Sequence, residues 1–477
     1  MIDSAYQKTL QDFSGSVVGI GVTAFNRIGP SFFLPSYQII CAKKSSDLPI
    51  FKDNGIAVQS VEGDFGKKLR SYNSLEILRS QAVQDYLNAL PQPVWIYLYR
   101  SSANIEEICD KQGWQVLTNR SHLRDKFENK KYFRQLLKQL NLPLIKGKTI
   151  ALNELKKPNA WQSLVTELGD KLVFQLTEMF KGGGIGTTFV FSQTDFEQFL
   201  QKVTTLKEER ELSHVNVVQF IQGFNSSITG CVTKYGILHG PVQTQIIDQI
   251  VSEGDNKHGR FCGHDWSFKA YSENVQNQAN QIVTRFGEHL AKEGYKGIFG
   301  LDLMIDQASG TVYSIECNPR YTGAFPVYTM LSLEIGETPF DVFHLMEHLD
   351  LEYEVDIETV NRTLQQAKSG AHLVLHNRKE EWVKVGGHMP AGVCTFDEGN
   401  IVWLRPGFKP SQIQADNEFI FTDGCPHQGD LIKPGLRFGK LIFNKGILDQ
   451  NQQLQDWTKQ LVEKFYQAMG FEVASGS

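Results

Sequence analysis

The 477-residue sequence lacks the cysteine pattern of a disulfide-bonded or zinc-binding protein. Its seven cysteines are odd in number, widely spread and without a CxxC pair, which argues against a disulfide framework and a zinc knuckle. No apolar run approaches the roughly eighteen residues that a membrane-spanning helix needs, and the N-terminus is polar rather than basic and then apolar. These absences predict an unsecreted, cytoplasmic protein with reduced thiols and no membrane partner.

A strong charge of one sign is also missing. The chain has 48 basic and 53 acidic residues, which give a formal net charge of -5, and no block of like charge stands out along it. Proteins that bind nucleic acid do so mainly through clustered cations. We therefore expect no nucleic-acid partner.

The length divides the chain into about three units, because 477 residues are too many for one core. Residues 1–118 alternate β-like runs with helical stretches, which is typical of a parallel α/β sheet. An acidic stretch that starts at Leu351 marks a second boundary. Residues 351–477 combine short β runs with a final helix and predict a smaller α+β domain. The expected fold class is therefore α/β and α+β, with a middle unit at residues 119–350.

Neither of two common glycine motifs of nucleotide-binding proteins is complete. Gly19 and Gly21 end the first β-like run, but no third glycine follows at the spacing that dinucleotide binding requires. Residues 181–187, KGGGIGT, join two β-like runs without the closing Gly-Lys-Ser/Thr of a Walker A loop. Such glycines still let backbone amides approach a phosphate, although three consecutive glycines are as often a surface turn.

Residues 300–323, GLDLMIDQASGTVYSIECNPRYTG, have the pattern of a β-hairpin. Apolar and polar residues alternate in its first run, and its second run is rich in β-formers. If Asp306 pairs with Val312, the same register sets Asp302 opposite Glu316, where two like charges destabilise the ladder unless a cation lies between them. The alternative is a solvent-facing hairpin, because a slip of one residue would separate the two acids.

Asn318 and Arg320 extend this pattern toward a metal and phosphate site. Two carboxylates and the Asn318 amide are oxygen ligands that suit Mg²⁺, with Mn²⁺ as a second candidate, and leave coordination positions for water and phosphates. Arg320 adds a guanidinium that can clamp a phosphoryl or carboxylate oxygen. The string Glu-Cys-Asn-Pro-Arg, with a second acid about fourteen residues upstream, resembles the E-x-N-x-R signature of the ATP-grasp superfamily.

The resemblance implies an ATP-grasp fold with ATP and Mg²⁺ as cofactors. Residues 1–118 would form an N-terminal parallel α/β domain, and residues 119–350 a nucleotide-binding domain with a lid subdomain at about 145–215. Residues 351–477 would form a C-terminal α+β domain that closes the site. The lid would exclude water from a reactive intermediate.

The resemblance also assigns roles to residues outside the hairpin. Lys126, in a helix expected over residues 119–140, would reach nucleotide phosphates, whereas Lys130 and Lys131 are expected on its solvated face. Gln175 stands where many members carry a phosphate-binding lysine, and Lys181 is its candidate substitute. The nucleotide-binding residues that the resemblance implies are Lys126, Gln175, Lys181, Gly182, Gly183, Gly184 and Gly186, with Gln219, Phe220 and Ile221 lining an adenine slot.

The activity that the resemblance implies is that of an ADP-forming carboxylate-amine ligase acting through an acyl phosphate. Its substrates would be ATP, a small carboxylate such as an amino acid or small peptide, and an amine, and a homodimer is common in the family. Arg320 would neutralise the acyl phosphate, and Arg260, in an irregular polar stretch at residues 254–266, is a candidate carboxylate anchor. The alternatives are bicarbonate activation, as in biotin carboxylase, and a non-catalytic ATP-binding module, which Gln175 in place of lysine favours.

Overall fold

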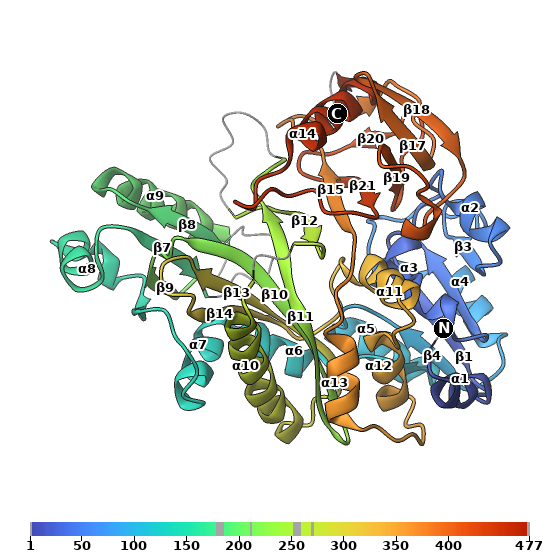
Figure 1. The fold of residues 1–477 in the computed structure, drawn as a ribbon, viewed down its shortest axis with the longest axis horizontal. Coiled ribbons are helices and arrows are strands. Elements are labelled where there is room, and N and C mark those ends of the chain that lie inside the picture. The colour runs from blue at the N-terminus through green and yellow to red at the C-terminus, as the bar shows by residue number, and fades with distance from the viewer. Residues whose placement is uncertain (1, 178–185, 210–211, 251–258, 269–270, 475–477) are drawn as a thin grey trace.

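The computed structural model describes residues 2–177, 186–209, 212–250, 259–268 and 271–474. In Figure 1 the N-terminal part, drawn in blue, lies at the right, and a small sheet around residues 147–219 lies at the far left. Most of the C-terminal part, drawn in darker orange and red, lies at the upper right. Long central strands run between these parts.

A five-stranded parallel sheet forms the N-terminal part, which confirms the prediction for this region. Its elements are α1 (Ser4–Gln11), β1 (Ser16–Gly21), η1 (Phe25–Arg27), η2 (Gly29–Phe32), β2 (Tyr37–Cys41), α2 (Leu48–Asp53), β3 (Val58–Ser60), α3 (Ser74–Arg79), α4 (Gln81–Asn88), β4 (Val94–Tyr97), α5 (Ala103–Gln112) and β5 (Gln115–Val116). The strand order is β3-β2-β1-β4-β5. All six residues of β1 are buried, as expected for a parallel strand covered on both faces.

Two helices replace the single helix expected over residues 119–140. They are α6 (Ser121–Glu128) and α7 (Lys130–Gln139). Asn129 between them has an extended backbone, and its side chain accepts a hydrogen bond of 3.0 Å from the backbone N–H of Tyr132. Asparagine is a strong N-cap residue, so it ends one helix and starts the next. The apolar periodicity of the two helices runs on across this break, which is why the sequence pattern suggested one helix.

A four-stranded antiparallel sheet of order β6-β9-β7-β8 lies in the region predicted as the lid, and we keep the name lid for it. Its elements are β6 (Gly147–Ala151), η3 (Glu154–Lys156), α8 (Ala160–Leu168), β7 (Leu172–Leu176), β8 (Thr187–Val190), α9 (Gln193–Glu209) and β9 (His214–Gln219). Phe174 and Phe199 are fully buried in its own small core. The predicted phosphate-loop residues Lys181, Gly182, Gly183 and Gly184 lie outside the described residues, whereas Gly186 is described and buried next to β8.

A ten-stranded antiparallel sheet links the middle of the chain to its C-terminal part. The middle part contributes β10 (Gly223–Thr233), β11 (Gly236–Ile247), β12 (Phe261–Asp265), β13 (Gly297–Asp306) and β14 (Val312–Asn318), with α10 (Glu273–Lys292) packed on β10 and β11. Its core includes Val283, Phe286 and Phe299. The hairpin predicted at residues 300–323 is thus β13 and β14 at one edge of this sheet.

The C-terminal part continues the same sheet, since its first strand pairs with β12. Its strands are β15 (Ala371–His376), β16 (Val383–Val385), β17 (Gly392–Asp397), β18 (Asn400–Arg405), β19 (Glu418–Thr422), β20 (Leu431–Ile432), β21 (Arg437–Phe443) and β22 (Phe471–Val473). Its helices and those that lead into it are α11 (Phe325–Glu334), α12 (Phe340–His348), α13 (Ile357–Leu364), η4 (Pro410–Gln412) and α14 (Asp456–Ala468). The sheet order is β14-β13-β10-β11-β12-β15-β21-β19-β17-β18, so one sheet carries residues from the hairpin to the C-terminal part.

Helices long and apolar enough to cross a membrane are absent from the part of the chain that the structure describes.

Candidate functional site

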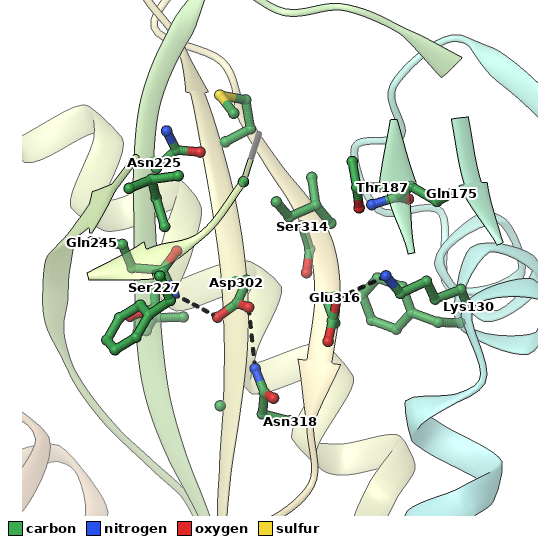
Figure 2. Close-up of a pocket in the computed structure, with 18 of the residues that line it drawn as sticks. Lys130, Gln175, Thr187, Asn225, Ser227, Gln245, Asp302, Ser314, Glu316 and Asn318 are labelled. Atoms are coloured by element: carbon green, nitrogen blue, oxygen red, sulfur yellow. Dashed lines mark hydrogen bonds and ion pairs between the residues drawn. The ribbon is translucent and has the colours of Figure 1, made fainter. Parts of the chain in front are cut away.

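The hairpin of β13 and β14 sets Asp302 directly opposite Glu316, as the sequence predicted. Figure 2 shows both carboxylates on the same face of the hairpin, with Lys130 on one side and Gln245 on the other. The two acids are partly buried. Two like charges in this position repel each other and call for a compensating cation.

The register at the tip of the hairpin differs from the one assumed from the sequence. Val312 pairs with Ile305 rather than with Asp306. A β-bulge follows, in which Ile315 adds one residue to β14, and this extra residue brings the two acids opposite each other. The predicted pairing of the acids is therefore confirmed, but by a bulge that the sequence pattern did not reveal.

Asp302 is held from both sides by amide groups. Gln245 Nε2 donates to Asp302 Oδ1 at 2.9 Å, and Asn318 Nδ2 donates to Asp302 Oδ2 at 3.2 Å. Burial, together with the charge of Glu316, raises the pKa of Asp302 above its usual range, while these hydrogen bonds act in the opposite direction. A cation at this position would favour the ionised form of the carboxylate.

Lys130 is the lysine that reaches the hairpin. Its Nζ lies 3.2 Å from Glu316 Oε2, and only 11% of its side chain is exposed. Lys126 instead forms an ion pair of 2.7 Å with Glu293 and does not line the cavity described below. The structure thus reverses the positions expected for the two lysines. The break at Asn129 explains the reversal, because it starts a new helix whose first residue faces the hairpin.

Arg320 is anchored on both sides of its guanidinium. Its Nε donates to Glu128 Oε1 at 2.7 Å, and its Nη2 donates to Asn318 Oδ1 at 3.1 Å. Asn318 in turn donates to Asp302, so one hydrogen-bonded chain joins the arginine to the carboxylate. Sequence reasoning did not identify Glu128, which is the last residue of α6.

These residues line a cavity of about 490 Å³. Its walls come from the lid, the hairpin, β10 and β11, the start of α11, and β21 of the C-terminal part. Eight of the predicted site residues line it, namely Gln175, Gln219, Phe220, Ile221, Asp302, Glu316, Asn318 and Arg320. Among the described residues, Lys130, Gln245, Thr187, Ser227 and Arg437 also line the cavity but were not predicted.

The lid strands that the structure describes contribute neutral side chains to the cavity, and Gln175 stands where many ATP-grasp members carry a lysine. Gln175 on β7 pairs with Thr187 on β8, and Figure 2 shows both near Lys130. Apolar lining residues flank them, including Val173 and Val218. In this part of the described chain, Lys130 provides the cation that the pattern assigned to the lid strand.

Arg260 lies beside the cavity rather than in its lining. Its neighbours Gly259 and Phe261 line the cavity, and its own backbone N–H donates to Asp248 Oδ1 at 2.6 Å. The stretch around it was expected to be irregular, but residues 261–265 form β12, which pairs with both β11 and β15. One of these partners, β15, is distant in the sequence, so its pairing with β12 leaves no local pattern in the sequence.

The donor set at the hairpin fits a divalent cation that is bound together with phosphates. Among the residues that the structure describes, no group of three or more His, Cys, Asp and Glu side chains is placed to hold a metal ion. Asp302 and Glu316 supply two carboxylates, and the Asn318 amide lies between them and Arg320. Mg²⁺ and Mn²⁺ suit such a site, because Mg²⁺ takes one or two carboxylates and completes its shell with water and phosphate oxygens.

Two sequence comparisons agree with this geometry. Residues 125–324 match a family described as an ATP-grasp domain. The chain is also 22% identical over 271 residues to the arginine-specific large chain of carbamoyl phosphate synthase from Geobacillus stearothermophilus. That match covers 56% of this chain and 24% of the relative, so the chain spans about a quarter of the length of the curated relative it matches.

Solved structures with the same fold cover most of the chain. Biotin carboxylase from Campylobacter jejuni has a TM-score of 0.60 at 14% identity, over 90% of this chain and 87% of that one. The biotin carboxylase domain of 2-oxoglutarate carboxylase from Hydrogenobacter thermophilus has a TM-score of 0.58 at 12% identity, over 90% and 86%. Phosphoribosylamine–glycine ligase from Thermotoga maritima has a TM-score of 0.56 at 13% identity, over 96% and 97%.

The parallel N-terminal sheet, the lid sheet and the acidic hairpin together define the ATP-grasp fold. The family match identifies residues 125–324 as an ATP-grasp domain, and the chain as a whole shares the fold of the solved structures named above.

Proposed function

We propose that this protein is an ATP-dependent, ADP-forming ligase that joins a small carboxylate to an amine through an acyl phosphate. The observation that carries the proposal is the opposition of Asp302 and Glu316 on the wall of a cavity that also contains Lys130 and Arg320. An amino acid or a small peptide is the substrate class we propose. The match to an ATP-grasp domain supports the use of ATP with Mg²⁺ or Mn²⁺.

The nucleotide base would lie at the hinge between β9 and β10. The backbone N–H groups of Gln219 and Phe220 already donate to Lys146 and Lys171 carbonyls at 2.9 Å each. Among the described residues, the backbone N–H of Ile221 has no such partner, so Ile221 is the hinge residue best placed to recognise adenine. Apolar lining residues such as Val218 and Met304 would sandwich the ring.

The phosphates would extend from the hinge toward the hairpin. Asp302, Glu316 and Asn318 would hold the metal, and Lys130 would add a positive charge at the phosphates. When bound, Mg²⁺ would reduce the repulsion between the triphosphate and an attacking carboxylate. Gln175 and Thr187 would offer neutral hydrogen-bonding groups from the lid.

Arg320 is the residue that we assign to the reacting carboxylate. Its hydrogen bonds to Glu128, Asn318 and the Tyr321 carbonyl fix the plane of the guanidinium before substrate arrives. A fixed positive group of this kind stabilises charge that develops during transfer, because it needs no reorganisation at that moment. The amine would then attack the acyl phosphate and release phosphate.

The test is Mg²⁺-dependent release of ADP from ATP, with amino acids offered singly and in pairs. We expect release that requires two substrates and that is lost in Glu316→Gln, since the neutral amide binds a cation more weakly. Glu288→Gln is the matched control, because Glu288 is an exposed residue of α10 outside the cavity. Equal ADP release by the Glu316→Gln and wild-type proteins would contradict the proposed metal site.

Bicarbonate activation is the second candidate. Two of the structures described above are biotin carboxylases, and one of them was solved with MgADP and bicarbonate. Parallel assays with and without added bicarbonate separate the candidates. ADP release that depends on bicarbonate and not on an amino acid would favour carboxyphosphate chemistry, and nucleotide binding without any turnover would favour a non-catalytic module.

A further inference from the structure

Arg437 is a cationic side chain that neither the metal site nor the phosphate site uses. It is the first residue of β21, stands opposite His376 in the pairing with β15, and lines the same cavity as Arg320. The residue is accessible to solvent, yet burial within the protein lowers its pKa. Solvent accessibility together with a pKa lowered by burial is expected of a guanidinium that faces a cavity inside the protein.

The charged groups next to Arg437, Lys440 and Asp423, are already paired with each other. Lys440 Nζ lies 3.0 Å from Asp423 Oδ2 and donates to Asn26 Oδ1 at 3.1 Å and to the Gly323 carbonyl at 2.8 Å. Asp423 also accepts hydrogen bonds from Asn26 and from Thr23. The charge of Asp423 acts against the effect of burial on the pKa of Arg437. The carboxylate oxygens of Asp423, however, are already bound to Lys440, Asn26 and Thr23.

Arg320, another cation of the cavity lining, is matched as well. Arg320 is paired with Glu128 at 2.7 Å. His376, opposite Arg437, has its pKa lowered to about 3, mainly by burial, and is therefore neutral at pH 7. Within the described part of the chain, Arg437 has neither a hydrogen bond nor an ion pair. The positive charge of Arg437 therefore lacks a counter-ion, and a charge enclosed by protein is costly until it is paired.

The wall beside Arg437 favours an anion. Residues 322–325, at the start of α11, line the cavity there, and α11 has no side-chain cap at its N-terminus. The partial positive charge of an uncapped helix start adds to that of the guanidinium. Gly323 lies within this turn, and a Cβ at Gly323 would lie 3.5 Å from Nη1 of Arg437. The backbone and the guanidinium thus adjoin without a side chain between them.

We propose that Arg437 binds the carboxylate of the amine-bearing substrate, so that the nucleophile is an amino acid or peptide with a free carboxylate. This inference rests on the proposed ligase function. Arg320 would bind the carboxylate that is activated. Arg437 adjoins Gly323, three residues after Arg320, and would bind a second carboxylate that does not react. A planar guanidinium matches a carboxylate through paired hydrogen bonds.

The kinetic test compares an amino acid with its carboxamide as the amine substrate. The amide keeps the nucleophilic amine and loses the negative charge. We expect the KM of the amide to exceed that of the acid by about tenfold or more in the wild-type protein, and the two values to become equal in Arg437→Gln. Arg437→Lys keeps the positive charge but loses the planar, paired donors of the guanidinium. We expect it to give an intermediate ratio of the KM of the amide to the KM of the acid.

Two further variants make the test specific. Lys433→Gln removes the same charge from an exposed position four residues before Arg437 and is expected to keep the wild-type ratio. Gly323→Ala changes no charge and meets no atom closer than 3.5 Å, so the fold should accept it, yet its methyl group would crowd the bound carboxylate. We expect it to raise the KM of the acid. An unchanged ratio in Arg437→Gln, or an unchanged KM in Gly323→Ala, would overturn the assignment.

If no pair of substrates is turned over, that result alone contradicts the proposed ligase function. A binding test then still measures whether Arg437 binds a carboxylate. Phenylglyoxal modifies accessible arginines, and mass spectrometry can follow Arg437 in the full chain with Mg²⁺ and a non-hydrolysable ATP analogue present. We expect a pool of amino acids, but not the matching pool of amides, to protect Arg437. No modification of Arg437, equal protection by both pools, or protection by bicarbonate alone would overturn the proposal.

Discussion

Lys130 Nζ lies 3.2 Å from Glu316 Oε2, so the first residue of α7 pairs with a carboxylate of the central hairpin. Figure 2 shows Glu316 between Lys130 and Asp302, which places one cation next to two opposed acids. This pairing neutralises part of the charge of the hairpin in the absence of ligand. Under the proposed function, Lys130 would give a protein with glutamine at position 175 a positive charge beside the nucleotide phosphates.

Replacing Lys130 should impair nucleotide use far more than replacing Lys126. In Lys130→Met we expect the KM for ATP to rise by about tenfold or more, because a charge-assisted contact to the phosphates is lost. Lys126→Met should stay close to wild type, since Lys126 pairs with Glu293 outside the cavity. Steady-state ADP release over a range of ATP concentrations gives both values. A larger defect in Lys126→Met than in Lys130→Met would contradict the assignment.

Arg320→Lys should lower kcat although the positive charge is kept. A lysine offers a point charge and cannot hold Glu128 and Asn318 at the same time, as the guanidinium does. Asn318 would then be less well fixed against Asp302. We expect a fall in kcat of about tenfold or more, measured as ADP release at saturating ATP. The exposed Arg362→Lys on α13 is the control, and equal kcat values for the two variants would count against this role.

The buried ion pair between Lys368 and Glu337 tests stability outside the site. The two charged atoms are 2.8 Å apart, and 1% of each side chain is exposed. Lys368→Met should lower the free energy of unfolding by about 3–5 kcal/mol, because it leaves a buried carboxylate without its partner. The double variant Lys368→Met/Glu337→Gln should recover part of this loss. Urea unfolding measures both, and equal stability of Lys368→Met and wild type would refute the expectation.

Asp341 should give the protein a specific dependence of stability on pH. It is buried on α12, accepts a hydrogen bond of 2.6 Å from Thr329, and has its pKa raised to about 7 by burial. The folded protein therefore retains a proton that the unfolded chain releases near pH 4. The contribution of this group to the free energy of unfolding is present below about pH 4 and falls as the pH rises toward 7.

The variant Asp341→Asn removes this titration and keeps the size of the side chain. We expect the free energy of unfolding of the variant to depend less on pH between about 4 and 7 than that of the wild-type protein. Urea unfolding at several pH values measures the two slopes. Parallel slopes would show that Asp341 titrates normally in the folded protein.

The sequence was informative where a function depends on a short string. The acids, Asn318 and Arg320 lie within nineteen residues of one hairpin, so alternation and spacing were enough to place them together. The parallel N-terminal sheet could also be predicted from the sequence, because its strands are continuous buried runs between helices. The hinge residues were placed by resemblance, and the structure sets them in the cavity lining.

What the sequence did not reveal depends on contacts between distant segments. Gln245 reaches Asp302 from 57 positions away, and Arg437 enters the cavity from the C-terminal part of the chain. Pairings of this kind leave no periodic signal in either segment. The reversal of Lys126 and Lys130 had a local signal, since Asn129 is a strong N-cap residue, but the continuous apolar rhythm concealed it.

The most direct test of the central claim follows oxygen atoms from the carboxylate substrate into phosphate. Amino acids labelled with ¹⁸O in their carboxyl groups are offered in pairs with ATP and Mg²⁺, and the released phosphate is analysed by mass spectrometry. If an acyl phosphate forms in this cavity, each phosphate carries one ¹⁸O from the substrate, and Glu316→Gln yields none. Phosphate that is released without label in the presence of both substrates would contradict the acyl-phosphate mechanism.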